Sequence, residues 1–227
     1  VSKPFFNNSL TLSAGLRMDG NTYSKNMQNP LQQLSPRVSA SYALTDRLNV
    51  NFNTGLYYQT PALTTLGFKD STNTYINREN NLKYMRCAHI VGGLEYSSKN
   101  NARFTIEGFY KGYSQYPQSV RRGIALANEG GDFGVVGNES VLSLSVGRSY
   151  GLELFAQQKL FKGFYGLMAV TLFRSEFVNA NKATFAPSNW DQRFIINLTA
   201  GKKLKRNWEL GAKFRLTGGR PFTPYDT

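Results

Sequence analysis

Residues 10–19 read LTLSAGLRMD, and their side chains alternate strictly between two kinds. Leucine, alanine and methionine occupy the even positions, whereas threonine, serine, glycine, arginine and aspartate occupy the odd ones. A period of two residues is typical of a β-strand that has one apolar and one polar face. Strands in soluble proteins average about five or six residues. The alternation therefore predicts an unusually long strand in this part of the chain.

The same pattern recurs in the segments that follow. Eight further segments alternate in this way or, in one case, are apolar on both faces: 37–45, 48–59, 88–96, 103–111, 152–157, 164–174, 193–200 and 208–217. Apolar residues at helical spacing are hard to find. We therefore predict an all-β chain of about nine strands, each about nine to twelve residues long.

The connections between these segments are of two kinds. Tight turns are expected at 45–47, 98–101, 161–163 and 203–206, and long polar loops at 19–36, 60–86, 114–147 and 176–191. The two kinds alternate, so an up-and-down sheet would place all the tight turns at one edge and all the long loops at the other. Outer-membrane barrels have this asymmetry, and tilted strands of about nine to eleven residues span a bilayer. The sequence therefore predicts an antiparallel up-and-down transmembrane β-barrel.

The expected strand count bears on the domain organisation. An odd number of strands does not close the usual bacterial barrel. Both ends of the sequence, Val1-Ser2-Lys3-Pro4 and Pro224-Tyr225-Asp226-Thr227, look like cuts. Residues 1–227 are therefore expected to be a portion of a larger barrel.

Composition excludes several other classes of protein. Aromatic residues make up 14% and charged residues 18% of the chain, which excludes intrinsic disorder. No run of eighteen apolar residues occurs, so a helical membrane span is excluded. The single cysteine, Cys87, and the single histidine, His89, cannot form a multi-thiolate or multi-histidine metal site. We therefore expect neither a metal nor another cofactor.

Alternation assigns the charged residues of the strands to the polar face, which would line the interior of a barrel. Eleven residues are candidates for contact with a plug or a substrate: Arg17, Arg37, His89, Glu95, Arg103, Glu107, Lys111, Glu153, Arg193, Lys213 and Arg215. Both signs of charge occur, so a wet wall of paired charges is a second interpretation. The candidates for a membrane-interface girdle on the apolar face are Tyr42, Tyr58, Tyr96, Tyr110 and Trp208. Loop aromatic residues could also contact substrate, namely Tyr75, Tyr84, Tyr113, Tyr116 and Phe133.

Other functional interpretations are weaker. A barrel hydrolase would need a serine and a carboxylate beside His89, and no spacing places a serine there, so we expect no enzyme and no catalytic residue. The net charge of +13 is compatible with nucleic-acid binding, but no basic helix or RNA-binding motif accompanies it. The basic turn of Lys202, Lys203, Lys205 and Arg206 is interpreted as solvated. A large soluble β-sheet with a binding function stays open as an alternative.

Six short motifs resemble those of TonB-dependent outer-membrane receptors. They are LSPRVSASY at 34–42, GLYYQTP at 55–61, EGFYK at 107–111, YGLEL at 150–154, WDQRF at 190–194 and GGRPFTPYD at 218–226. The last two are similar to late-barrel motifs in receptors of the Bacteroidetes type. The order and spacing of the six motifs extend the resemblance over nearly the whole chain.

This resemblance implies an outer-membrane barrel of about 22 strands, plugged by an N-terminal domain and driven by the TonB system. Its function would be the import of a scarce nutrient such as a ferric chelate, glycan, peptide or vitamin. Residues 1–227 would form the middle-to-late barrel, with the plug domain, TonB box and final strands absent. The implied partners are outer-membrane lipid and lipopolysaccharide, the plug domain, the TonB complex, and a surface lipoprotein or other envelope protein. A barrel that has lost transport and docks partner proteins is the alternative.

Overall fold

The structure is a computed structural model that describes residues 1–7, 9–130, 135–180 and 182–221. Over these ranges the chain forms one antiparallel sheet of eleven strands. The strands are β1 (Ser2–Phe5), β2 (Leu10–Arg17), β3 (Ser35–Thr45), β4 (Leu48–Gln59), β5 (Met85–Ser97), β6 (Ala102–Ser119), β7 (Val141–Phe161), β8 (Phe164–Asn179), β9 (Lys182–Pro187), β10 (Phe194–Lys203) and β11 (Glu209–Thr217). Short helices occupy the connections: α1 (Lys25–Gln28), α2 (Leu63–Leu66), α3 (Ile76–Glu79), and the 3-10 turns η1 (Pro30–Gln33), η2 (Leu126–Asn128) and η3 (Lys205–Asn207). In the described ranges, no helix is long and apolar enough to cross a bilayer.

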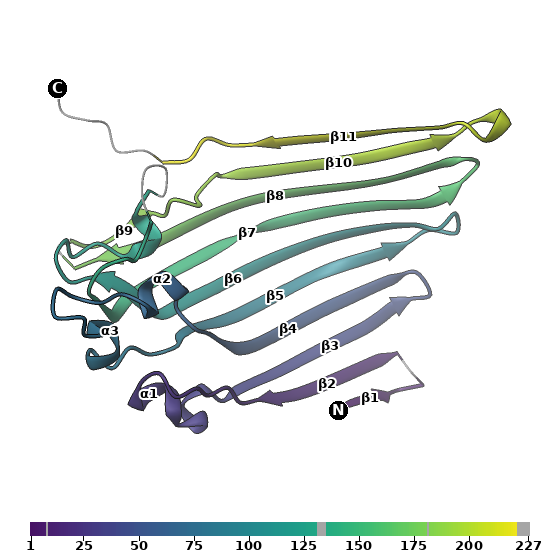
Figure 1. Ribbon diagram of the computed structural model, residues 1–227. Helices are drawn as coiled ribbons and strands as arrows, with labels where there is room; N and C mark the ends of the chain where they lie inside the picture. The colour runs from purple at the N-terminus through teal and green to yellow at the C-terminus, as the bar shows by residue number, and fades with distance from the viewer. Residues whose placement is uncertain (8, 131–134, 181, 222–227) are drawn as a thin grey trace.

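Strands that follow one another in sequence lie side by side in the sheet. The order runs from β1 to β8 and then to β10 and β11, while β9 pairs with β8 beside this path. Figure 1 shows the tight turns along one edge and the long loops and short helices along the other. We call these the turn edge (turns at 45–48, 97–102, 161–164 and 203–209) and the loop edge (connections at 18–34, 60–84 and 120–140). The predicted up-and-down antiparallel architecture is confirmed.

The two faces of the sheet differ in chemistry, as the alternation predicts. One row of directly paired residues crosses five strands and contains Tyr42, Val50, Leu94, Ile106 and Leu154. Most of these side chains are exposed, and no second sheet covers them in the described part of the chain. We call this side the apolar face and the opposite side the polar face. Lipid can cover such an exposed apolar face, because a barrel buries its backbone polar groups in its own ladders.

The buried apolar core lies among the loops. Its first cluster consists of Met27, Leu82, Tyr84, Leu126 and Val141, so it joins three connections of the loop edge to the start of β7. Asn77 on α3 is fully buried and holds the same region together. Its side-chain amide nitrogen donates to the carbonyls of Thr65 and Glu139 at 2.7 and 2.8 Å, and its oxygen accepts from the Val141 backbone at 2.8 Å. The loops therefore form a packed cap at this edge.

Some strands differ in length from the sequence-based expectation. β6 has 18 residues and β7 has 21, and both extend into residues 114–147, for which the pattern predicts a loop. The register shifts between Tyr113 and Tyr116, where Gln115 has a φ of 57°. This irregularity breaks the period of two, although the strands pair beyond it. The short strands β1 and β9 contain too few residues to establish a period, and the pattern does not predict them.

Candidate functional site

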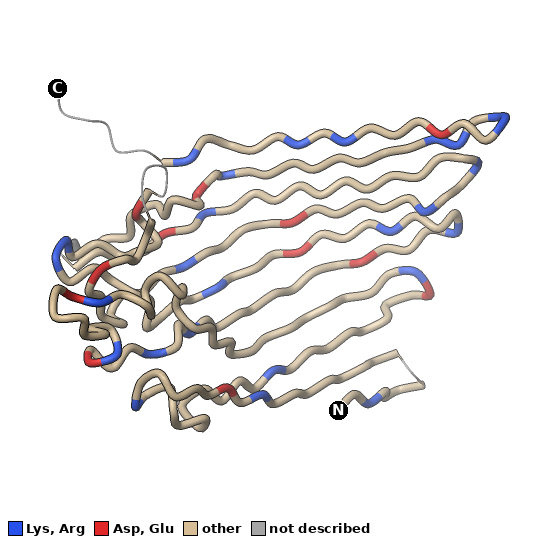
Figure 2. Tube along the Cα trace, in the orientation of Figure 1, with Lys and Arg blue, Asp and Glu red and all other residues tan. Residues whose placement is uncertain are grey.

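The polar face carries a row of basic and aromatic groups close to the loop edge, and Figure 2 shows where the charges fall along the strands. From β3 to β6 the register places Arg37 beside Gly55, Gly55 beside His89, and His89 beside Lys111. A Cβ on Gly55 would lie 3.0 Å from both the Arg37 Cγ and the Pro36 carbonyl oxygen. Because glycine has no side chain, the Arg37 side chain has room to lie over β4 at this position.

Tyr57 lies between the arginine and the histidine of this row. The guanidinium carbon of Arg37 is 4.3 Å from the centroid of the Tyr57 ring, within the range of a cation–π contact. The rings of Tyr57 and His89 are 4.3 Å apart with an interplanar angle of 31°. The Nε of Arg37 is buried and has no hydrogen-bond partner among the described residues. The arginine is thus held by an aromatic ring, and its buried Nε forms no hydrogen bond with a described residue.

These groups line a hollow of about 1060 Å³, which we call the inner cavity. Its opposite side is aromatic, because the rings of Tyr113 and Tyr116 contact Phe177 at centroid distances of 5.3 and 4.6 Å. Arg17 also borders the cavity, but its guanidinium donates to Asp19 at 2.6 Å. No aspartate or glutamate occurs among the described residues that line it. The inner cavity therefore combines positive charge with ring faces.

Two carboxylates lie directly opposite one another on the polar face. Glu107 of β6 pairs in register with Glu153 of β7. The other neighbour of Glu107 is Gly93, and that of Glu153 is Thr171. Neither glutamate takes part in the ion pairs found within the described ranges. Like charges directly opposite in a sheet are destabilising, so this pair suits a basic partner.

The other candidates for the polar face are dispersed over the sheet. Glu95 and Arg103 form an ion pair of 3.7 Å near the turn edge. Arg193 precedes β10, and its Nε lies 3.1 Å from the buried carboxylate of Asp191. The remaining two lie on β11, opposite residues of β10, and are Lys213 and Arg215. The structure thus brings Arg17, Arg37, His89 and Lys111 together, but it leaves these others outside the inner cavity.

The five aromatic residues expected at a membrane interface take different positions. Tyr42 and Tyr96 are exposed on the apolar face near the turn edge, and Trp208 is exposed in the turn between β10 and β11. Tyr110 is exposed and lies between Ile90 and Tyr150, nearer the loop edge. Tyr58 is half-buried and packs against the loop core, where it also borders the inner cavity.

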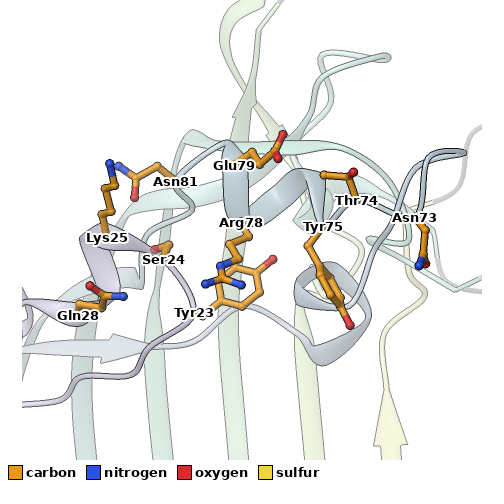
Figure 3. Close-up of a pocket in the computed structure, with 10 residues that line it drawn as sticks. All are labelled: Tyr23, Ser24, Lys25, Gln28, Asn73, Thr74, Tyr75, Arg78, Glu79 and Asn81. Carbon is orange, nitrogen blue, oxygen red and sulfur yellow. The ribbon is translucent and has the colours of Figure 1, made fainter.

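A second hollow of about 890 Å³ lies among the loops, and we call it the outer pocket. In Figure 3, Arg78 extends from α3, and Tyr75 extends from the position just before this helix. Both side chains point toward the side on which Tyr23 lies. The hydroxyl of Tyr23 donates to the Leu66 carbonyl at 2.8 Å. Burial raises the pKa of Tyr23, whereas the nearby charge of Arg78 partly opposes this shift. The outer pocket is mostly polar.

The connection between β6 and β7 contains a charged cluster. Arg122 lies 2.8 Å from Glu129 and also pairs with Glu139, whose other oxygen accepts from the Ser119 hydroxyl. The Glu129 side chain is only 6% exposed. Burial raises the pKa of Glu129, Arg122 lowers it in part, and Glu139 raises it further. In the described part of the chain, no group of three or more histidine, cysteine, aspartate or glutamate side chains is arranged to hold a metal ion.

Comparison with known proteins decides the family. Residues 4–227 match the family described as "TonB dependent receptor-like, beta-barrel". The chain belongs to the TonB-dependent receptor β-barrel family. This confirms the resemblance to TonB-dependent receptors, without the Bacteroidetes type, and places the protein in the outer membrane. The search of curated proteins found no match.

Solved structures of TonB-dependent receptors share the fold. The alcaligin outer-membrane receptor FauA of Bordetella pertussis is 14% identical, with a TM-score of 0.59 over 92% of this chain and 35% of that one. The ferripyoverdine receptor of Pseudomonas aeruginosa, bound to ferripyoverdine, is 15% identical, with a TM-score of 0.61 over 92% of this chain and 26% of that one. The iron transporter FrpB of Neisseria meningitidis is 13% identical, with a TM-score of 0.57 over 91% of this chain and 30% of that one. The chain therefore spans about a third or less of the length of these structures.

Membership of the TonB-dependent receptor β-barrel family orients the sheet. In outer-membrane barrels the short turns face the periplasm and the long loops face the exterior. The inner cavity and the outer pocket thus lie toward the external side. Sequence reasoning missed Tyr57 and Phe177 as cavity residues, although Tyr57 marks a place where two tyrosines interrupt the alternation of 48–59. Phe133 and most of the GGRPFTPYD motif (residues 222–226) lie outside the described residues.

Proposed function

We propose that this chain forms part of an outer-membrane receptor that imports an anionic nutrient by TonB-driven transport. The inner cavity is the observation that carries the proposal. Arg37 and Lys111 bring positive charge to it, His89 lies between them in the row, and no described carboxylate lines the cavity. A cavity at the external end of a barrel with fixed cationic donors attracts anions and orients them through charge-assisted hydrogen bonds.

A ferric chelate fits this cavity better than a neutral glycan, a peptide or a vitamin. Such chelates present several acceptor oxygens around the metal, which the Arg37 guanidinium and the Lys111 ammonium can engage. Flat parts of a chelate can pack against the rings of Tyr57 and Tyr113. Two of the receptors with the same fold, those for alcaligin and ferripyoverdine, support this choice of ligand class.

The carboxylate pair supports a plug domain as the partner of the polar face. Glu107 and Glu153 project from neighbouring strands to the same side, and no described residue of opposite charge pairs with them. Basic side chains of a plug from the same full-length chain would neutralise both groups. The wall around this pair would then bind the plug, while the cavity nearer the loops would bind the nutrient.

The test uses the full-length receptor as the sole receptor in cells with and without TonB function. Accumulation of a panel of radioiron-labelled anionic chelates is measured, with maltohexaose and cyanocobalamin as neutral comparisons. We expect TonB-dependent accumulation of at least one chelate. Because hydrogen bonds to charged groups contribute about 1.5–3 kcal/mol each, the Arg37→Gln/Lys111→Gln variant should raise the half-saturation concentration about tenfold or more.

The Lys213→Gln/Arg215→Gln variant is the matched control, because it removes the same charge from the same face at β11. It should leave the half-saturation concentration unchanged. Equal accumulation with and without TonB, or the same loss in both variants, would contradict the proposal. Absence of any uptake would favour the alternative of a barrel that docks partner proteins, for which the outer pocket offers an external surface.

A further inference from the structure

The turn edge has a strong excess of positive charge at two adjacent turns. Lys159 and Lys162 flank the β7–β8 turn, and the β10–β11 turn carries four more basic residues, Lys202, Lys203, Lys205 and Arg206. Figure 2 shows these basic positions at the turn ends of the strands. All six side chains are exposed. We call them the basic rim.

The two turns form one surface. The backbone nitrogen of Lys203 donates to the carbonyl of Gly163 at 2.7 Å. β8 and β10 are direct neighbours in the sheet, so no strand separates the turns. The six basic residues therefore project from a continuous patch of the turn edge.

This patch contains six basic residues, and no carboxylate in the described part of the chain forms an ion pair with any of them. Glu209, the acidic residue of the turn, lies opposite Lys203 in the ladder and accepts a hydrogen bond of 2.6 Å from the Tyr165 hydroxyl. Nearer the loop edge, arginines 122, 148, 174 and 193 pair with carboxylates, whereas Lys69, Lys83 and Arg121 form no ion pair in the described ranges. The basic rim thus keeps a strong excess of positive charge, with Glu209 as the one carboxylate placed opposite a rim residue in the described ladder.

The position of Lys202 indicates on which face of the sheet an anionic partner of the basic rim would lie. It belongs to the row of the apolar face that runs from Phe164 on β8 through Lys202 on β10 to Leu210 on β11. Phe164 is 45% and Leu210 63% exposed, and Trp208, on the same turn, is 68% exposed. An ammonium in such a row lies at the boundary between lipid chains and headgroups, where aromatic rings also gather. A soluble periplasmic protein cannot reach this row once lipid covers the apolar face.

We propose that the basic rim binds the phosphate headgroup of an anionic phospholipid in the periplasmic leaflet of the outer membrane. Lys202, Lys205 and Arg206 would hold the headgroup, and the acyl chains would lie along Phe164 and Leu210. Charge complementarity selects an anionic over a zwitterionic lipid, because basic side chains near a membrane surface attract negative headgroups. The proposal does not depend on the transported nutrient.

The full-length receptor is purified in detergent and exposed to equal amounts of phosphatidylglycerol and phosphatidylethanolamine with identical acyl chains. Native mass spectrometry then counts the lipids that remain bound. We expect the wild-type receptor to retain phosphatidylglycerol preferentially. The Lys202→Gln/Lys205→Gln/Arg206→Gln variant should lose this preference by at least about fivefold, the effect expected for one basic residue near an anionic surface.

The Lys69→Gln/Lys83→Gln/Arg121→Gln variant serves as the control, because it removes three exposed basic residues from the loop edge. It should keep the preference. The single Lys202→Met variant guards against misfolding, since methionine suits an apolar row. It should keep the heat-dependent gel shift of a folded barrel and still weaken phosphatidylglycerol retention.

Three results would overturn the proposal. The first is that the wild type shows no preference between the two lipids. The second is that the triple rim variant retains phosphatidylglycerol as well as the wild type does. The third result concerns a soluble acidic partner, probed with polyglutamate. If the rim variant lost polyglutamate binding while its phosphatidylglycerol retention stayed unchanged, the rim would serve such a partner instead of lipid.

Discussion

At Gly93, strands β5 and β6 approach each other so closely that a side chain would not fit between them. A Cβ at this position would lie 2.6 Å from the Glu107 Cγ and 2.9 Å from the Glu107 Cα. Backbone cannot move away as a flexible side chain can, so the strands would have to shift. The glycine therefore allows Glu107 to stand beside Glu153 on the polar face.

Gly93→Ala should destabilise the barrel of the full-length receptor by about 1–3 kcal/mol, the usual cost of overpacking. The measurement is the temperature at which the folded, fast-migrating gel band disappears in detergent. Gly15→Ala is the control, because a Cβ at Gly15 would meet nothing within 4 Å. Equal melting temperatures for the two variants would show that β5 and β6 are farther apart than the structure indicates.

In the connection between β6 and β7, one buried carboxyl group couples the stability of the loop to pH. Arg122, Arg121 and Glu139 are the charged groups that act on Glu129. Its pKa is raised first by burial and further by Glu139. The folded loop therefore holds the Glu129 proton to a higher pH than the unfolded chain does.

The sign of the pH effect follows from this difference. The pKa of glutamate in an unfolded chain is about 4.3. The stability contributed by protonated Glu129 is fully present below that value and is lost as pH rises through the raised pKa. We expect hydrogen-exchange protection of residues 120–128 and 135–141, corrected for intrinsic rates, to fall over this range. Glu129→Gln should flatten the dependence, whereas Glu79→Gln, an exposed loop change, should not. A slope that persists in Glu129→Gln would contradict the assignment.

Regular strands could be predicted from the sequence, whereas irregular ones could not. Alternation located β2 to β5 because the residues of their two faces differ in polarity at most steps. It failed in the parts of β6 and β7 nearest the loop edge, where the register shift near Gln115 interrupts the alternation of apolar and polar residues. The strands still pair there, but their side chains no longer alternate in polarity, so the sequence does not indicate the strand.

The candidate site was predictable in part for the same reason. Alternation fixes the face on which Arg37, His89 and Lys111 lie, because a face follows from parity alone. Their grouping into one cavity depends on register between strands, and the aromatic wall with Phe177 comes from a distant part of the chain. Neither register across long loops nor packing of a cap follows from a local period.

The whole sheet has two open edges in the described structure. β1 pairs with β2 only, and β11 pairs with β10 only. Each edge presents unpaired backbone N–H and C=O groups, which lipid cannot satisfy, so an open sheet is not stable in hydrocarbon. The exposed apolar face, in turn, is not stable in water. Both constraints would be met if further strands joined β1 and β11 into a closed barrel.

Residues 1–227 produced alone should therefore fail to form a compact membrane-inserted monomer. After refolding into detergent micelles, we expect no difference in gel migration between boiled and unboiled samples, together with rapid proteolysis of the strands. The full-length receptor, refolded by the same protocol, should show the heat-dependent shift of a closed barrel and resist the protease. A heat-modifiable, protease-resistant monomer of the 227-residue segment would mean that β1 and β11 can close on each other, and the open sheet would not be the form the segment takes in a membrane.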